Sequence, residues 1–122
     1  MAQYRWTVED AAAMLPAQAP GRLRAATIFE RGTLSLELYA PQGRDEQTPH
    51  TQDELYVVVS GHGEFVNGAE RHPFQAGDVL FVPAGVEHRF ENFSADFQTW
   101  VIFYGPQGGE QADGEGELTG RD

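Results

Sequence analysis

The sequence contains neither cysteine nor lysine, and its positive charge comes entirely from 8 arginines. Without cysteine the chain cannot form a disulfide framework, a thiolate nucleophile, an iron–sulfur cluster or a cysteine zinc finger. Without lysine it cannot form a Schiff base with a carbonyl substrate. The groups left for chemistry among 122 residues are 4 histidines and 19 carboxylates, so any metal site here is built from nitrogen and oxygen ligands.

Basic residues are scarce overall. The 8 arginines stand against 19 acidic residues, which gives a formal net charge of -11. Because phosphate binding needs a positive surface, this balance argues against nucleic acid as a partner. No stretch approaches the roughly 18 apolar residues of a membrane span, and the N-terminal segment lacks the basic and apolar regions of a secretory signal. We therefore expect a cytoplasmic protein that does not bind membranes.

The two ends of the chain differ from its middle. Residues 7–15 carry a capping-box pattern, with Thr7 at the N-cap and Asp10 three residues later. This pattern favours one short helix within residues 1–24, and a loosely docked N-terminal arm explains the segment equally well. Residues 106–122 are acidic and rich in glycine, and such a segment buries too little apolar surface to offset its ordering entropy. We predict a disordered tail there.

Residues 25–105 show the pattern of an all-β domain. Short apolar runs alternate with Gly, Pro and Asn turns, which predicts a sandwich or a small barrel. Asn67 and Gly68 are typical of a hairpin turn. The expected strands cover residues 25–30, 33–40, 54–60, 64–66, 69–72, 79–82, 87–93 and 97–104.

Two of these strands carry informative apolar patterns. Leu34, Leu36 and Leu38 alternate with polar residues and predict one face in the core and one face in water. Residues 57–59 are all valine, so we expect both faces of their strand to be covered. A strand that is apolar on both faces also favours a homodimer.

Two of the histidines lie where their side chains can point inward. His50 and Glu54 are four residues apart, so in an extended chain they point to the same face. His88 shares a face with Phe90, whereas its sequence neighbours are charged. An inward histidine in an apolar barrel needs a partner for its ring nitrogens, either a hydrogen bond within the core or a metal ion. The remaining histidines are expected in exposed turns, at His62 and His72.

The same residues lie in two motifs that resemble those of the cupin superfamily. In the first motif the second His, the Glu and the closing Gly are matched by His50, Glu54 and Gly61. The second motif is matched at each fixed position, by Gly77, Pro83, Gly85, His88 and Asn92. The resemblance covers roughly residues 25–105 and is to small single-domain bacterial cupins. It implies a cupin-type double-stranded β-helix, which is a jelly-roll barrel.

The resemblance also implies a metal site, with one departure from the usual pattern. Cupins usually bind one divalent ion through three His and one Glu, but Thr48 stands where the first His is expected. His50, Glu54 and His88 remain as implied ligands for Fe, Mn, Zn or Ni. A two-His, one-carboxylate set leaves positions open for water or substrate. The loop residues that could also reach the metal, directly or through water, are Asp45, Gln47, Thr48 and Gln52.

The apolar inward faces indicate a pocket for a small organic molecule. Tyr56 lies near the implied ligands and is a candidate acid or base. For each aromatic residue, the alternative is that it only fills the core. The residues assigned to the substrate pocket are Leu38, Thr48, Gln52, Phe81, Phe90 and Trp100.

Two functions are open at this point. The first is a mononuclear divalent-metal enzyme, dioxygenase-like or isomerase- or decarboxylase-like, and this hypothesis rests on analogy with the family. The second is a non-catalytic cupin that binds or senses a small ligand with a degenerate metal site. The threonine at position 48 favours the second hypothesis.

Overall fold

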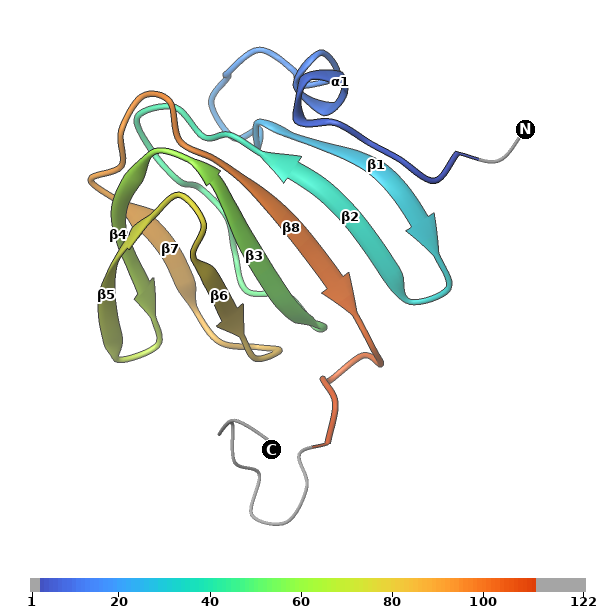
Figure 1. The fold of residues 1–122 in the computed structure, drawn as a ribbon. Helices are drawn as coiled ribbons and strands as arrows, with labels where there is room; N and C mark the ends of the chain where they lie inside the picture. The colour runs from blue at the N-terminus through green and yellow to red at the C-terminus, as the bar shows by residue number, and fades with distance from the viewer. Residues whose placement is uncertain (1–2, 112–122) are drawn as a thin grey trace.

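The computed structural model describes residues 3–111, and within that range the chain forms two antiparallel sheets and one short helix, α1 (Val8–Ala12) (Figure 1). The prediction of an all-β domain with a short N-terminal helix is confirmed. The strands are β1 (Ala25–Arg31), β2 (Leu34–Tyr39), β3 (Asp53–Ser60), β4 (His62–Asn67), β5 (Glu70–Gln75), β6 (Val79–Val82), β7 (His88–Glu91) and β8 (Gln98–Tyr104).

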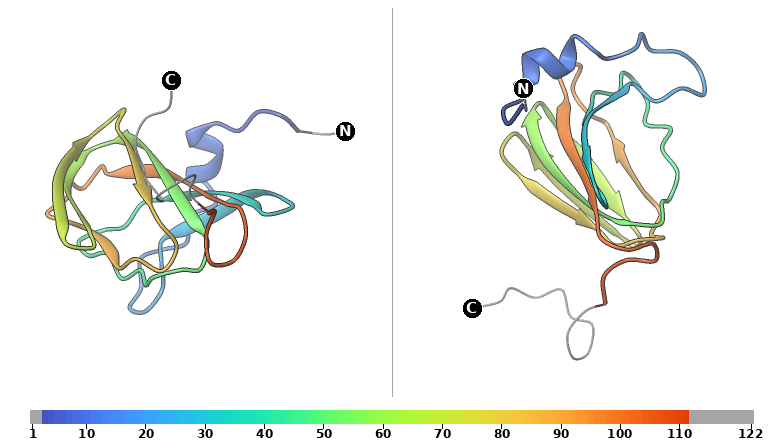
Figure 2. Two further views of the ribbon diagram at one scale, coloured as in Figure 1. Left: turned by 90° about the horizontal axis from the view of Figure 1, so that it is seen from below. Right: turned by 90° about the vertical axis from the view of Figure 1, so that its right-hand side faces the viewer.

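The two sheets face each other across one interior. The larger sheet has five strands in the order β1-β2-β8-β3-β6, and the smaller sheet has three in the order β5-β4-β7. In the view from below in Figure 2, the strands curve around this common interior. The free edge of β7 is bridged to the larger sheet by a loop residue, because the Phe90 N–H donates to the Asp45 carboxylate at 2.8 Å.

Aromatic side chains fill much of the space between the sheets. The Phe90 ring centroid lies 4.7 Å from that of Phe97, 4.8 Å from Phe65, 5.3 Å from Phe74 and 4.9 Å from Tyr56. All five side chains are buried. Burying a side chain of this size stabilises the fold by about 1.5–3 kcal/mol. We call Phe65, Phe74, Phe90 and Phe97 the aromatic cluster.

The structure corrects the predicted faces of β2. Glu37 pairs with Val101 of β8, and Val101 pairs in turn with Tyr56 of β3. Directly paired residues of antiparallel strands point to the same face, and Tyr56 is in the core, so Glu37 and Tyr39 point into the barrel. The leucines of β2 point outward. Leu38 is nevertheless fully buried, on the side of the sheet where α1 packs against β1 and β2.

The N-terminal helix begins as the capping-box pattern predicts. The Thr7 hydroxyl accepts a hydrogen bond from the Asp10 N–H at 3.0 Å. The regular helix ends at Ala12, earlier than the predicted end at residue 15. No helix within residues 3–111 has the length and hydropathy that a membrane span requires.

The hairpin between β4 and β5 turns one residue later than predicted. Asn67 still pairs with Glu70, so the turn lies on Gly68 and Ala69. Gly68 has a φ of 61°, a conformation that costs glycine little.

The segment after β8 packs against the barrel, where a disordered tail was expected from Pro106 onward. The Gly108 N–H donates to the Thr51 carbonyl at 2.6 Å, and the Glu110 N–H donates to the Asp53 carboxylate at 2.8 Å. The rest of the expected tail, residues 112–122, lies outside the described residues.

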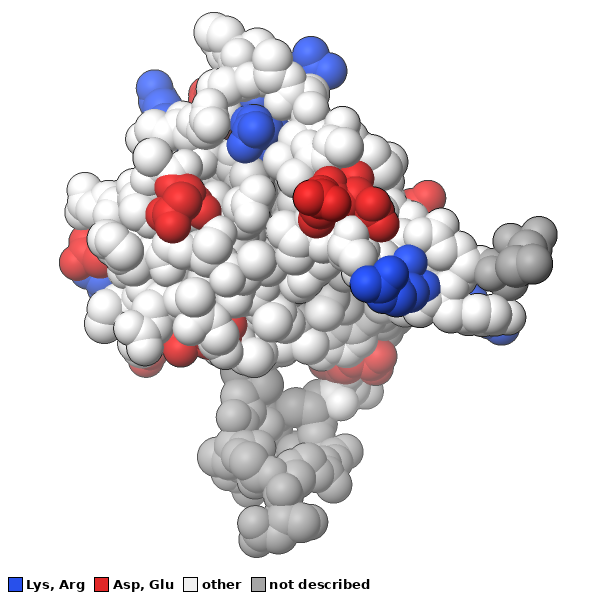
Figure 3. All heavy atoms as spheres, turned by 45° about the horizontal axis from the view of Figure 1, so that its top comes forward, with Lys and Arg blue, Asp and Glu red and all other residues white. Residues whose placement is uncertain are grey.

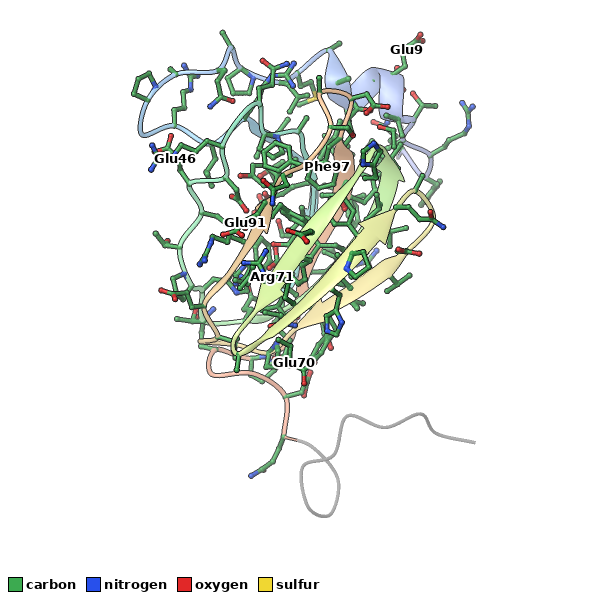
Figure 4. The ribbon with its side chains drawn as sticks, turned by 90° about the vertical axis from the view of Figure 1, so that its left-hand side faces the viewer. Glu9, Glu46, Glu70, Arg71, Glu91 and Phe97 are labelled. Atoms are coloured by element: carbon green, nitrogen blue, oxygen red, sulfur yellow. The ribbon has the colours of Figure 1, made fainter. Side chains whose placement is uncertain are left out.

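Charged side chains are spread over the surface. In the view of Figure 3, acidic and basic groups are interspersed on the face that is shown. Arg71 and Glu91 approach each other on the outside of the smaller sheet in Figure 4, where Arg71 forms ion pairs with Glu91 at 2.8 Å and Glu64 at 2.9 Å. Exposed pairs of this kind contribute little to stability.

Candidate metal centre

Three side chains converge at the end of the barrel where β3 begins and β8 ends. Glu54 is the second residue of β3, His50 lies in the loop just before it, and His88 is the first residue of β7. One ligand atom from each residue lies within 4.8 Å of the other two. The Glu54 Oε1 atom is 2.6 Å from His50 Nε2 and 3.2 Å from His88 Nε2. We call His50, Glu54 and His88 the metal triad.

The backbone fixes the tautomer of both histidines. His50 Nδ1 lies 2.8 Å from the Gln52 carbonyl oxygen, and His88 Nδ1 lies 2.8 Å from the Val86 carbonyl oxygen. A carbonyl oxygen can only accept a hydrogen bond, so Nδ1 carries the proton in each ring. The lone pair of each neutral ring therefore lies on Nε2, the atom that faces Glu54. Hydrogen bonds of this type orient histidines that ligate metals.

His88 Nε2 is a buried polar atom without a hydrogen-bond partner among the described residues. It lies near Glu54 Oε1, but the direction of approach does not meet hydrogen-bond geometry. The side chains of His88 and Glu54 are 0% and 1% exposed, so bulk water does not compensate for the missing partner. Nitrogen lone pairs that face a carboxylate need a positive charge between them, supplied by a proton or by a metal ion. The donor set suits a divalent transition metal or zinc.

The charges within the triad shift the pKa values of two of its members. Burial alone would lower the pKa of His50, but the hydrogen bond and negative charge of Glu54 outweigh it and raise that pKa. Burial alone would raise the pKa of Glu54, but its contacts with His50 and His88 outweigh it and lower that pKa. In the absence of a metal, the triad therefore favours a protonated histidine beside an ionised glutamate.

The neighbours of His50 limit its freedom. Its ring packs edge-on against Phe103 of β8 at a centroid distance of 4.7 Å and against His88 at 4.8 Å. Its backbone carbonyl accepts a hydrogen bond from the Gly85 N–H at 2.7 Å. The loop that carries His50 is thereby tied to the turn of the second cupin motif.

A polar network occupies the barrel interior beside the triad. The Tyr56 hydroxyl donates to Gln47 Oε1 at 3.0 Å, and Gln47 Nε2 donates to Asp45 Oδ2 at 2.7 Å. The Tyr39 hydroxyl donates to Asp45 Oδ1 at 2.5 Å. Two of the loop residues that were expected to reach the site, Asp45 and Gln47, therefore contact its surroundings through the tyrosines.

The environment of Tyr56 argues against the expected acid–base role. Its side chain is fully buried and its hydroxyl proton is held by Gln47. Burial, followed by the charges of Glu54 and Asp45, raises the pKa of Tyr56 well above its ordinary value of 10. Tyr56 therefore stays protonated and serves as a hydrogen-bond donor next to Glu54.

The structure separates the residues assigned to the substrate pocket. Phe90 lies in the interior as part of the aromatic cluster, and Thr48 is exposed in the loop before β3. Leu38, Phe81 and Trp100 were placed in the pocket, but their strand partners put them on the outer face of the larger sheet. Alternation defines the two faces of a strand, but when both faces are apolar it does not identify the inner one.

Gln52 lies at the barrel end beside the triad. Its side-chain amide donates to the backbone carbonyls of Thr33 and Gly105 at 2.9 and 3.0 Å. Its backbone carbonyl oxygen accepts the hydrogen bond that orients the ring of His50. Gln52 also borders an open cavity of about 300 Å³ whose other lining residues include Thr33, Ser35 and Gly105. No triad residue lines this cavity, and Gln52 is the lining residue that also contacts His50.

Asp53 fastens the same end of the barrel. Its carboxylate accepts hydrogen bonds from the backbone N–H groups of Ala84 and Glu110, at 2.9 and 2.8 Å. A side chain at Gly109 would collide with it, because a Cβ atom there would lie 2.9 Å from Asp53 Oδ1. Asp53 thus holds the second-motif turn and the C-terminal segment together beside the triad.

Sequence reasoning missed Glu37, which faces the interior near the triad. Burial raises its pKa, the charges of Glu54 and Glu30 raise it further, and His50 lowers it. Alternation with leucines suggested a solvent-facing position. A signal was present in Tyr39, a large aromatic residue on the same face of the strand.

The other motif residues have structural positions. His62 and His72 are exposed, as expected, but they lie in strands β4 and β5 and not in turns. Asn92 has a φ of 52°, and its side-chain amide donates to the Glu64 carboxylate at 2.9 Å rather than to backbone.

Comparison with known proteins identifies the family. The Cupin_2 family model, described as a cupin domain, matches residues 35–103. The chain is 42% identical to the uncharacterized protein SCO3923 of Streptomyces coelicolor over 76 residues, which are 61% of this chain and 72% of that protein. The chain belongs to the cupin family, and the resemblance in its two motifs is confirmed.

Solved structures share the fold at low sequence identity. A conserved protein with a double-stranded β-helix domain from Klebsiella pneumoniae has a TM-score of 0.68 at 17% identity, covering 84% of this chain and 90% of that one. A predicted oxalate decarboxylase from Thermotoga maritima has a TM-score of 0.54 at 21% identity, covering 69% of this chain and 81% of that one. The fold is the double-stranded β-helix of the cupins.

Proposed function

We propose that this protein is a mononuclear divalent-metal enzyme that acts on a small organic molecule. The observation that carries the proposal is the orphaned His88 Nε2, which is buried and directed with His50 Nε2 toward one oxygen of Glu54. The metal is Fe, Mn, Zn or Ni, and the reaction is dioxygenase-like or isomerase- or decarboxylase-like. The likeness to a predicted oxalate decarboxylase supports the fold alone.

The residues around the triad have separate tasks in this proposal. His50, Glu54 and His88 would hold the ion, which supplies Lewis acidity and open coordination positions for water or substrate. The carbonyls of Gln52 and Val86 keep Nε2 of each histidine free for binding. Tyr56 and Phe103 pack around the ligands and limit the access of water.

Elemental analysis tests the proposal directly. The protein is purified without an oligohistidine tag, and its metal content is compared with that of the variant His88→Gln. We expect close to one divalent ion per chain, and loss of that ion in the variant while the circular dichroism spectrum is unchanged. A natively folded wild-type protein that binds none of the four metals when they are supplied contradicts the proposal. Oxygen uptake with catechol-like and 1,3-dicarbonyl compounds then tests the dioxygenase branch.

A second candidate function is a cupin that binds or senses a small ligand without turnover. Limited access to the triad favours it, because the side chain of His50 is 19% exposed while Glu54 and His88 are almost fully shielded. A metal-loaded protein that binds small molecules but converts none of them supports this second function.

We further propose that the protein forms a homodimer through the outer face of its larger sheet. Leu55 and Val57 lie on that face, paired with Phe81 and Val79, and Val79 is 61% exposed. The sequence predicted that both faces of β3 are covered, and a second copy of the chain would cover its outer face. Light scattering after size exclusion measures the mass, and Val79→Glu is expected to shift it from dimer toward monomer.

A further inference from the structure

Glu37 faces the metal triad from the middle of β2 without a partner of its own. Its direct neighbours across the sheet are Thr27 of β1 and Val101 of β8, and Val101 lies between Glu37 and Tyr56. Within residues 3–111, no hydrogen bond or ion pair involves the Glu37 side chain, which is half-buried. A half-buried carboxylate that faces a binding site without a donor is suited to receive one from a ligand.

The position of Glu37 is close to the triad but outside it. Its carboxylate is not among the atoms that converge within 4.8 Å. Glu37, Val101 and Tyr56 lie in one row across the inner face of the larger sheet, and Glu54 is the next residue of β3 on that face, so Glu37 and the triad border the same part of the interior. Glu37 is therefore placed to contact a molecule bound at the triad rather than the ion itself.

Apart from the histidines of the triad, the barrel interior has no cationic side chain among residues 3–111 that could receive an anionic ligand. Arg24 is the only arginine of residues 3–111 that is not exposed, and its guanidinium donates to the Ala40 carbonyl at the end of β2 away from the triad. Three carboxylates, Glu37, Asp45 and Glu54, face or border the interior. One divalent ion leaves a negative charge uncompensated among them.

We infer that Glu37 is a specificity-determining residue, and that the site takes a small molecule carrying a positively charged N–H donor group, such as an amine or an amidine. This inference rests on the proposed function, because it assumes that the ligand binds at the triad. The donor group is directed to Glu37 while another part of the molecule lies toward the metal triad. A carboxylate or phosphate at the position next to Glu37 is disfavoured, because Glu37 would repel it.

Three planar molecules of nearly equal size test the inference. Benzamidine is a cation, benzamide is neutral and benzoate is an anion. Their dissociation constants are measured by NMR titration of the full-length protein, in zinc-loaded and in metal-free form. The variants are Glu37→Gln, which keeps the shape of the side chain, and Glu70→Gln, which removes the same charge from an exposed position of β5.

We expect the wild-type protein to bind benzamidine about tenfold more tightly than benzoate, with benzamide in between. Glu37→Gln should reduce this ratio by about tenfold, and Glu70→Gln should change it by less than about twofold. Equal or tighter binding of benzoate, no measurable binding of benzamidine, or an unchanged ratio in Glu37→Gln would each overturn the inference.

The two forms of the protein separate this inference from the proposed function. If no zinc binds, the proposed function fails, but the preference for benzamidine and its loss in Glu37→Gln can still be measured in the metal-free form. If zinc binds but Glu37→Gln leaves the preference unchanged, the proposed function stands and the role of Glu37 is wrong.

Discussion

The interior of the barrel has two regions built between the same sheets, the aromatic cluster and the metal triad. In the aromatic cluster, Phe90 contacts its neighbours at ring-centroid distances of 4.7–5.3 Å. All four side chains of the cluster are apolar, so none of them needs a hydrogen-bond partner when it is buried. In the metal triad, His88 and Glu54 are equally buried, but the Nε2 atom of His88 has no hydrogen-bond partner within residues 3–111. One region gains stability from its packing, and the other holds buried polar groups that need a missing positive charge.

The difference indicates what each region is for. Replacing a buried charged group by an apolar residue of similar volume is often neutral or stabilising, so a triad of this kind is weak evidence for stability. Packed aromatic side chains, in contrast, lose both burial and contacts when they are truncated. The comparison assigns folding to the aromatic cluster and binding to the triad.

The largest expected effect is on stability, in the aromatic cluster. Phe97→Ala should lower the free energy of unfolding by about 3–5 kcal/mol, because it removes a buried ring that contacts Phe74 and Phe90. Urea denaturation of the metal-free protein measures the change. The matched control is Tyr4→Ala, whose ring is 87% exposed and whose loss should cost less than about 0.5 kcal/mol. Equal losses of unfolding free energy in the two variants would contradict the assignment of stability to the aromatic cluster.

The next effect is on metal binding, in the triad. Glu54→Gln should weaken zinc binding by at least about 100-fold, more than the loss of a residue that only orients a ligand. The same variant should change the stability of the metal-free protein less than Phe97→Ala does, because glutamine keeps the shape of the side chain and the partly exposed His50 can lose its proton when Glu54 is replaced. Competition with a chromophoric chelator measures the affinity, and Glu64→Gln, a partly exposed glutamate of β4, is the control. Unchanged zinc affinity in Glu54→Gln would remove this residue from the metal site.

A smaller effect is expected from pH. The raised pKa of His50 contributes stability below its ordinary value near 6.5, which is lost as pH rises through the folded-state pKa. The lowered pKa of Glu54 contributes stability above its ordinary value near 4.5, which is lost as pH falls through the folded-state pKa. The melting temperature of the metal-free protein should therefore be highest between these values.

Zinc should change the alkaline side of this profile. The ion takes the place of the proton between His50 and Glu54, so the melting temperature of the zinc-loaded protein should not fall between pH 6.5 and 8. Differential scanning fluorimetry at a series of pH values gives both profiles. Parallel profiles for the two forms would mean that zinc binds elsewhere.

The smallest effect is expected at Thr48. Its side chain is exposed and makes no hydrogen bond to another residue within 3–111, so Thr48→Ala should change zinc affinity by less than about twofold. Isothermal titration calorimetry measures the affinity. A loss of tenfold or more would show that the hydroxyl acts at the metal, as the sequence suggested.

The triad residues could be chosen from sequence because their spacing is local. His50 and Glu54 are only four residues apart and their side chains meet at 2.6 Å, although the chain bends at residues 51 and 52. The second motif ends in the turn that leads into β7, where His88 is the first residue. Both motifs carry glycines with positive φ, at Gly77 and Gly85 among others, which only a few residue types tolerate. Positions of this kind can therefore be recognised from the sequence alone.

The lining of the interior could not be predicted in the same way. Strands β3 and β6 carry apolar residues on both faces, so alternation does not tell whether Phe81 and its partner Leu55 face inward or outward. Only the position of the second sheet decides this, and that position depends on contacts between distant segments. Glu37 was missed for a different reason: β2 alternates clearly, but its leucines face outward and Leu38 is buried there, so the pattern suggested the wrong face.

The hydrogen bonds of Asp53 have a practical consequence for anyone purifying this protein. The chain leaves β8 at Tyr104, and residues 108–110 are fastened beside the metal triad. Figure 1 shows α1 near the opposite end of the barrel. An oligohistidine segment joined directly after residues 108–110 would start beside the triad and compete for its metal, whereas one joined ahead of α1 would start at the other end of the barrel (Figure 1). Apparent metal content should therefore be compared with and without a tag.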